Sequence, residues 1–193
     1  MKIALTIVTF VVISIVIVLS YYGLFADIRL ENRNVGPFKL VYEKHIGDYK
    51  NTSVIMDKIY YTLLNEDSIA TTKGFGLYYD KPGTVETGKQ RSIAGCILEG
   101  QDEIKVAELS KKYNIKEFPA SDSIVVDFPF KGMVSIFIGI FRVYPQISDY
   151  LKEKGERLDA PVMEIYDGIN KRIIYIVPIN LERRVVDSYL IQE

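Results

Sequence analysis

An acidic side chain and a tyrosine on one face of a predicted strand are the first candidates for chemistry. Within residues 162–166 the two-residue period of a strand places Glu164 and Tyr166 on one face, and Met163 and Ile165 on the other. Both faces begin with apolar residues, so we expect an internal strand that carries an embedded carboxylate. A buried carboxylate is costly unless it is paired or hydrogen-bonded, and a tyrosine hydroxyl is a suitable donor. Glu164 is therefore a candidate ligand-binding or catalytic residue, with Tyr166 beside it as a ligand-binding candidate.

An exposed position is the alternative for Glu164. On an open sheet face its carboxylate would lie in water and pair with Lys171 or Arg172 on the returning strand. Tyr78 and Tyr79 are further candidates, because consecutive strand residues point to opposite faces and one of the two would face the same cavity as Glu164. Both tyrosines therefore join Glu164 in the candidate ligand-binding set.

Several kinds of site are missing from the sequence. It holds no glycine-rich phosphate loop, no nucleophile elbow, and no histidines or cysteines spaced for a metal ion. Cys96 is the only cysteine, which excludes an internal disulfide and a cysteine-rich zinc site. His45 is the only histidine, and we expect it to be structural or exposed. The net charge of −1, from 24 basic and 25 acidic residues, does not favour nucleic-acid binding.

A long apolar segment opens the chain. Residues 3–26 carry no charge, and about 20 apolar residues of helix suffice to cross a hydrocarbon core about 30 Å thick. Tyr21 and Tyr22 stand where an interfacial aromatic belt would lie. A cleaved secretory signal would have a shorter apolar stretch and small residues before the cut, whereas residues 24–26 are Leu-Phe-Ala. The segment is therefore predicted to be a retained, single-pass membrane anchor.

Basic residues beside this segment favour a cytosolic location for the soluble part. Lys2 precedes the segment, whereas Arg29, Arg33 and Lys39 follow it. Basic residues that flank a span tend to stay on the cytoplasmic side of the membrane. We therefore expect the soluble domain to face the cytosol.

The first half of the soluble part is predicted to contain a strand, a helix and two further strands. A polar connector at residues 27–36 leads into a strand at 38–45, where apolar and polar residues alternate. Apolar residues recur at helical spacing over 53–65, which predicts an amphipathic helix. Strands at 74–80 and 92–98 follow, on either side of a turn-rich stretch.

The second half is predicted to repeat this order after a short helix within residues 101–116. A strand, a long helix and a closing hairpin are expected at residues 123–128, 134–151, 161–166 and 172–177. Pro145 is expected to kink or restart the long helix, because a proline in a helix interior costs about 3 kcal/mol.

A repeated dipeptide marks the same point in both halves. Tyr79-Asp80 and Tyr166-Asp167 each close the third element and open its turn. Matching positions favour an internal duplication, with halves at residues 37–100 and 118–180. The predicted fold class is therefore α+β, with an N-terminal transmembrane helix followed by a duplicated β-α-β-β domain.

Short motifs also follow one another along the soluble part in a definite order. They lie at Tyr42 with residues 45–49, at residues 78–82, at Arg91 with residues 95–98, at residues 118–120, 128–130, 142–145 and 164–166, and at Pro178. This series resembles the GyrI-like domain superfamily, and its combination with an apolar N-terminus is most similar to single-span members of the ER-phagy receptor type. The resemblance implies one antiparallel sheet with two long helices on one face and a groove between them.

Three functions are implied by this resemblance, because relatives bind cationic drugs, bind haem or hydrolyse cyclopropane-containing toxins. The first is a membrane-anchored, non-enzymatic domain that binds a small amphipathic or cationic ligand or a protein partner, with Glu164 in the glutamate role. The second is a hydrolase of small strained electrophiles that uses Glu164 and a tyrosine, although residues 172–174, Arg-Ile-Ile, lack the second acidic group of many relatives. The third is haem binding, which would not require His45.

The predicted organisation is a transmembrane anchor at residues 1–26, a connector at 27–36, a GyrI-like domain at 37–180 and a short charged tail at 181–193. The expected partners are a membrane and a small-molecule ligand or a protein. We expect no nucleic acid, no metal ion and no cofactor other than haem.

Overall fold

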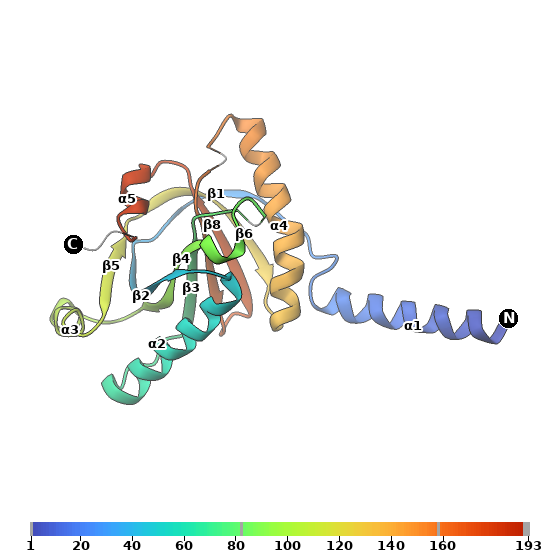
Figure 1. The fold of residues 1–193 in the computed structure, drawn as a ribbon, viewed down its shortest axis with the longest axis horizontal. Helices are drawn as coiled ribbons and strands as arrows, with labels where there is room; N and C mark the ends of the chain where they lie inside the picture. Colours follow the sequence, from blue (N-terminus) through green and yellow to red (C-terminus); the bar gives the residue numbers. More distant parts are fainter. Residues whose placement is uncertain (1, 82, 158, 191–193) are drawn as a thin grey trace.

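The computed structural model describes residues 2–81, 83–157 and 159–190, and its centre is one antiparallel sheet (Figure 1). The strands are β1 Glu31–Val35, β2 Phe38–Ile46, β3 Lys73–Tyr78, β4 Arg91–Leu98, β5 Asn114–Phe118, β6 Ser121–Pro129, β7 Val162–Asp167 and β8 Arg172–Pro178. Across the sheet they lie in the order β1-β6-β8-β7-β3-β4-β2-β5. The α-helices are α1 Lys2–Tyr21, α2 Thr52–Asp67, α3 Glu103–Leu109, α4 Met133–Lys154 and α5 Arg183–Asp187.

Both halves of the domain have the same strand pairing. β4 lies between β2 and β3 in the first half, and β8 lies between β6 and β7 in the second. β3 pairs with β7 and so joins the two halves. α2 and α4 follow the first strand of their respective halves and line one groove on the same face of the sheet. The predicted α+β fold, with a duplicated β-α-β-β unit and two long helices on one face, is confirmed.

Side chains alternate between the two faces of the central strands, so each face of the sheet packs into its own hydrophobic core. Phe75 and Leu77 of β3 pack with Met163 and Ile165 of β7 on the face away from the long helices, where Val186 of α5 covers them. Burying a side chain of this size contributes about 1.5–3 kcal/mol. The other face of β6 and β8 packs beneath α4, and α2 packs on β2 and β4. Residues facing α2 and α4 therefore belong to the groove side of the sheet.

β1, β5 and α5 have no counterpart among the elements expected from the sequence. β1 lies within the segment predicted as a connector, and it pairs with β6 about 90 residues further along the chain. Its sequence, ENRNV, has one apolar residue and no alternation. Arg33 on β1 forms an ion pair with Asp127 on β6, at 2.6 Å. This edge strand is specified by its distant partner, which local periodicity does not reveal.

Helix α4 continues through Pro145, so the predicted restart does not occur. A proline removes one backbone hydrogen bond, which here leaves the Phe141 carbonyl without its usual donor. Both Pro145 and Phe141 are exposed, so this carbonyl lies on the outer side of the helix. The cost of the proline is therefore smaller than in an enclosed helix.

Helix α1 projects from the domain, and its side chains are exposed along its length (Figure 1). Among the described residues it is the one helix that is long and apolar enough to cross a membrane, a property that a signal sequence shares.

Gly95 permits the close packing of β4 against β2, which makes it a test of the central sheet. An added Cβ at this position would lie 1.9 Å from the Val41 carbonyl oxygen, a backbone atom that cannot move aside. We expect Gly95→Ala to lower the free energy of unfolding by at least about 2 kcal/mol through overpacking. Urea unfolding in neutral detergent, followed by circular dichroism, measures this change.

Gly88→Ala is the matched control, because an added Cβ there meets nothing within 4 Å. We expect its unfolding free energy to stay within about 0.5 kcal/mol of that of the parent chain. Equal stability of the two variants would contradict the close β4–β2 approach.

Candidate functional site

A groove of about 760 Å³ lies between α2 and α4, with the sheet as its floor. We call it the interhelical groove. Its walls carry apolar and aromatic side chains, including Met56 and Tyr60 from α2 and Ile136, Phe137 and Ile140 from α4. A concave, mostly apolar cavity with a few polar groups is how small-molecule sites are usually built.

Glu164 forms a polar centre at the floor of the interhelical groove. Its side chain comes from β7 and the residue is 3% exposed. Tyr144 Oη on α4 donates to Glu164 Oε1 at 2.6 Å, and Tyr166 Oη donates to Oε2 at 2.6 Å. The embedded carboxylate expected from the sequence is therefore present, and each of its oxygens has a phenolic donor.

No lysine or arginine forms an ion pair with Glu164 within the part of the chain that the structure describes. Arg172, the partner considered for an exposed Glu164, pairs instead with Asp127 at 3.3 Å and with Asp167 at 3.6 Å. The open-sheet alternative for Glu164 is therefore wrong, because two helices cover this face.

Tyr78 extends the polar centre towards α2. Its hydroxyl lies 3.3 Å from Tyr166 Oη and 3.2 Å from Thr52 Oγ1. The Thr52 hydroxyl donates to the Tyr49 carbonyl, and the Tyr166 hydroxyl donates to Glu164, so the single proton of the Tyr78 hydroxyl is donated to one of these two neighbours at a time. Together with the Glu164 carboxylate, these hydroxyl groups link α2, β3, β7 and α4 in one hydrogen-bonded chain.

Gly76 makes room for this arrangement. An added Cβ at Gly76 would lie 2.5 Å from the Tyr78 hydroxyl, so the phenol lies across the bare backbone of its own strand. Gly76 is also the residue of β3 that pairs with Glu164 in the sheet. The absence of a side chain at Gly76 thus provides the space that the Tyr78 ring occupies in the floor of the groove.

Burial dominates the electrostatics of the site. It raises the pKa of Glu164 above its ordinary value, whereas the hydrogen bonds from Tyr144 and Tyr166 act in the opposite direction. Burial and the nearby Glu164 also raise the pKa of Tyr144 and of Tyr166 well above the usual value for a phenol. Both phenols are therefore protonated donors at neutral pH.

Three of the four tyrosine and glutamate candidates meet in the groove, and one does not. Glu164, Tyr166 and Tyr78 line it together. Tyr79 points to the opposite face, where its hydroxyl donates to the Val186 carbonyl at 2.7 Å and its ring belongs to the other core. The strand period predicted that one of the adjacent tyrosines would face away, and the structure identifies it as Tyr79.

Sequence reasoning missed Tyr144, which is the second donor to Glu164. A signal for it exists, because Ile136, Ile140 and Tyr144 recur every fourth residue and form one stripe along α4. A tyrosine in an otherwise aliphatic stripe indicates a polar partner across the helix–sheet contact.

Metal and haem ligands are sparse at the groove. No cluster of three or more histidine, cysteine or acidic side chains suited to a metal ion occurs in residues 2–81, 83–157 and 159–190. His45 does not line the groove, and its Nε2 lies 3.0 Å from the Asp48 carbonyl oxygen. A haem iron bound here would need a tyrosine, a methionine or Cys96 as its ligand.

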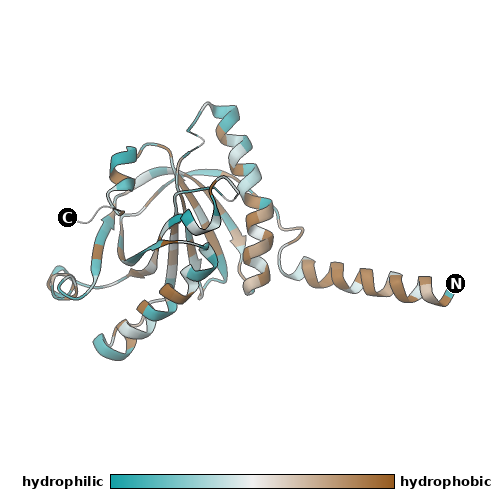
Figure 2. Cartoon of the chain, in the orientation of Figure 1, coloured by the Kyte–Doolittle hydropathy of each residue, from teal (hydrophilic) through white to brown (hydrophobic). Residues whose placement is uncertain are grey.

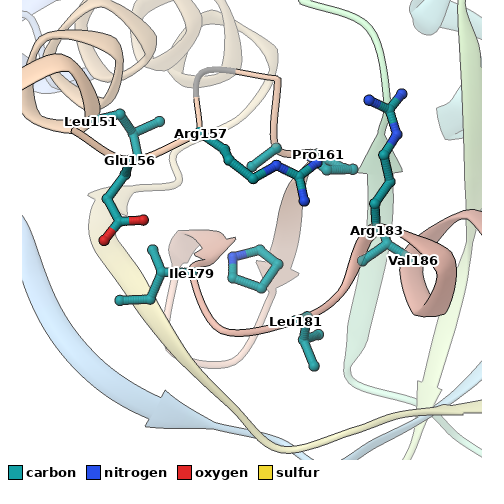
Figure 3. Close-up of a pocket in the computed structure, with 10 residues that line it drawn as sticks. Leu151, Glu156, Arg157, Pro161, Ile179, Leu181, Arg183 and Val186 are labelled. Atoms are coloured by element: carbon teal, nitrogen blue, oxygen red, sulfur yellow. The ribbon is translucent and has the colours of Figure 1, made fainter. Parts of the chain in front are cut away.

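A second cavity lies between the end of α4 and the segment before α5 (Figure 3). Leu151, Ile179 and Leu181 line it together with the charged residues Arg157 and Arg183. Its volume of about 20 Å³ accommodates roughly one water molecule. The interhelical groove is therefore the candidate site for an organic ligand.

Residues 30–175 match the family described as GyrI-like small molecule binding domain. The chain is 32% identical over 136 residues to testis-expressed protein 264 homolog of Mus musculus, and 31% identical over 161 residues to testis-expressed protein 264 of Homo sapiens. These matches cover 66% and 76% of this chain, but 41% and 47% of the two relatives. The chain thus spans less than half the length of these relatives.

Solved structures share the fold at low sequence identity. SAV2435 bound to tetraphenylphosphonium matches with a TM-score of 0.50 and 13% identity, over 79% of this chain and 94% of that one. The EcmrR C-terminal domain matches with a TM-score of 0.53 and 12% identity, over 78% and 96%.

Replacing Glu164 by glutamine tests the effect of burial on stability. Because burial raises the pKa of the folded carboxyl above its unfolded value, the folded state holds this proton more tightly. Stability is therefore lost as the pH rises from the unfolded pKa, about 4.3, towards the folded pKa. We expect Glu164→Gln to unfold at a higher urea concentration than the parent chain at neutral pH, with a difference that shrinks at acid pH.

Glu153→Gln is the matched control, since it removes an exposed carboxylate from the same helix that carries Tyr144. Its effect on the free energy of unfolding should be small, within about 0.5 kcal/mol, because the residue is exposed. A Glu164→Gln variant that is less stable than the parent at neutral pH would show that the two hydrogen bonds outweigh burial.

Proposed function

This chain belongs to the GyrI-like small-molecule-binding domain family, and from that premise we propose that the interhelical groove binds a small amphipathic cation without turning it over. The observation that carries the proposal is Glu164, a buried carboxylate with two phenolic donors and no ion-pair partner among the described residues. A positive charge in the groove would supply the missing partner and favour the ionised form of Glu164.

The walls of the groove suit the rest of such a ligand. Phe130, Phe137 and Tyr60 line it and offer aromatic surface to a lipophilic body. Tyrosine and phenylalanine rings also attract cations through their faces, by about 0.5–2 kcal/mol. Tetraphenylphosphonium, to which the structural neighbour SAV2435 is bound, combines a positive charge with aromatic groups and is a suitable probe.

We further propose that α1 anchors the domain in a membrane and that the domain faces the cytosol. Length and apolar composition of α1 support the span. Arg29 and Arg33 follow the uncharged segment at residues 3–26, whereas only Lys2 precedes it, and this excess of basic residues supports the cytosolic side.

Binding of tetraphenylphosphonium to the full chain in neutral detergent is the test of the ligand proposal. We expect Glu164→Gln to weaken binding at least about tenfold, because a desolvated charge pair is lost. The affinity of the parent chain should fall as the pH drops below the raised pKa of Glu164, whereas the variant should show no such dependence. Isothermal titration calorimetry measures both quantities.

Two controls separate the charge effect from changes in shape and detergent partitioning. Glu153→Gln should bind the cation as the parent chain does, since this carboxylate is exposed on α4. Triphenylphosphine oxide, a neutral molecule of similar shape, should bind the parent and Glu164→Gln alike. Equal affinity of both chains for the cation would overturn the assignment of Glu164.

Hydrolysis of a strained electrophile is the second candidate function. The observation that favours it is the placement of two protonated phenols 2.6 Å from the Glu164 oxygens, a carboxylate with adjacent proton donors. This alternative predicts a diol product from a small aryl epoxide, detected by chromatography, that is lost in Glu164→Gln. Absence of product from the parent chain at high protein concentration would leave binding as the function.

A further inference from the structure

Hydrogen bonds tie the end of α1 to α4. Arg142 Nη1 donates to the Gly23 carbonyl at 2.9 Å and to the Ala26 carbonyl at 2.7 Å, and Ser135 Oγ donates to the Tyr22 carbonyl at 3.0 Å. A cation at the C-terminal end of a helix also interacts favourably with its dipole. The first half of α4 therefore binds the segment that directly follows α1.

Packing strengthens this junction. Leu19 and Tyr22 pack against the core beneath α4. An added Cβ at Gly23 would lie 2.8 Å from the Phe128 ring, so the backbone passes directly over that side chain. Lys131 Nζ lies 5.6 Å from the centre of the Tyr21 ring. These contacts fix α1 and the domain relative to each other.

The half of α4 that holds this junction presents exposed apolar side chains. Phe141 is 78% exposed and Met133 is 60% exposed, and Val134 and Phe137 are exposed beside them. Figure 2 shows that the hydrophobic half of α4 lies next to α1, whereas its other half is hydrophilic. We call these four residues, Met133, Val134, Phe137 and Phe141, the α4 apolar face.

We infer that the α4 apolar face rests in the interfacial layer of the bilayer that α1 spans, an inference that depends on the proposed span. α4 crosses the direction of α1 rather than continuing it (Figure 1). With α1 along the membrane normal, α4 lies along the membrane surface. An amphipathic helix with apolar residues on one side binds membranes in this orientation.

Side chains at the junction fit the headgroup region of a bilayer. Tyr21 ends α1 and Tyr22 follows it, and Lys131 and Arg142 contact this part of the chain. Aromatic rings and basic groups are enriched at this level of a membrane protein. The junction holds the α4 apolar face next to the end of α1. If α1 spans a bilayer, the surface of that bilayer is therefore the partner nearest to this face.

The same placement determines where the groove opens. Met133 and Phe137 belong to the α4 apolar face and also line the interhelical groove. One rim of the groove thus meets the membrane surface, so that an amphipathic ligand dissolved in the lipid phase enters from the bilayer.

Fluorescence quenching in nanodiscs tests the inference with the full chain. In a Cys96→Ala background, single cysteines introduced as Phe141→Cys, Ile104→Cys and Val12→Cys carry an environment-sensitive dye. Ile104 is the control, because it is an exposed apolar residue on α3, at the end of the domain away from α1 (Figure 1). Lipids spin-labelled near the headgroup should quench the dye at Phe141 at least twofold and leave the dye at Ile104 unchanged.

The dye at Val12 separates the inference from the proposed span, since Val12 lies in the middle of α1. Lipids labelled near the bilayer centre should quench it. Quenching at Val12 without quenching at Phe141 would overturn the inference and leave the span intact. No quenching at either position would overturn both. A blue-shifted dye at Phe141 that no lipid quenches would identify a protein, such as a second copy, as the partner and would overturn the inference.

Discussion

The antiparallel pairing of β3 with β7 is the constraint on which the rest of the structure depends. It joins the two halves of the duplicated domain and sets Gly76 opposite Glu164. Because side chains alternate along a strand, a slip of one residue would turn Glu164 into the apolar core on the other face. The same pairing brings α2 and α4 to opposite sides of one groove. The register of the central sheet, the direction of the Glu164 side chain and the position of the groove thus all follow from the pairing of β3 with β7.

A buried carboxylate without a cation is an unfavourable element that the fold tolerates. Phe75, Leu77, Met163 and Ile165, on the opposite face of the same two strands, supply apolar burial that offsets its cost. The hydrogen bonds to Glu164 come from phenols rather than from lysine or arginine, so the negative charge is held in place without being neutralised. In a site of this kind, the group that lowers stability is also the group available to a ligand.

Much of this arrangement could be predicted from the sequence, because strand and helix periods identify elements whose own residues form the core. The embedded Glu164 and the duplicated fold follow from such patterns. β1 could not be found in this way, since its pairing with β6 depends on residues far along the chain. The repeated Tyr-Asp dipeptide marks the turn after the third element of each half, yet Tyr166 lies within β7 and faces the groove, whereas Tyr79 follows the end of β3 and faces the other core. Strand patterns could not reveal Tyr144, because it lies on α4 and contacts Glu164 of the sheet from the helix layer.

The junction between α1 and the domain has a mechanical consequence. A helix on a flexible tether can tilt without disturbing the domain it carries, whereas Ser135 and Arg142 bind the carbonyls of Tyr22 and Gly23, which directly follow α1. Helices tilt when a bilayer becomes thinner than their apolar length. If α1 spans a bilayer as proposed, such a tilt would move this domain with it, pressing one end of α4 into the membrane surface and lifting the other, and bilayer thickness would then alter access to the groove.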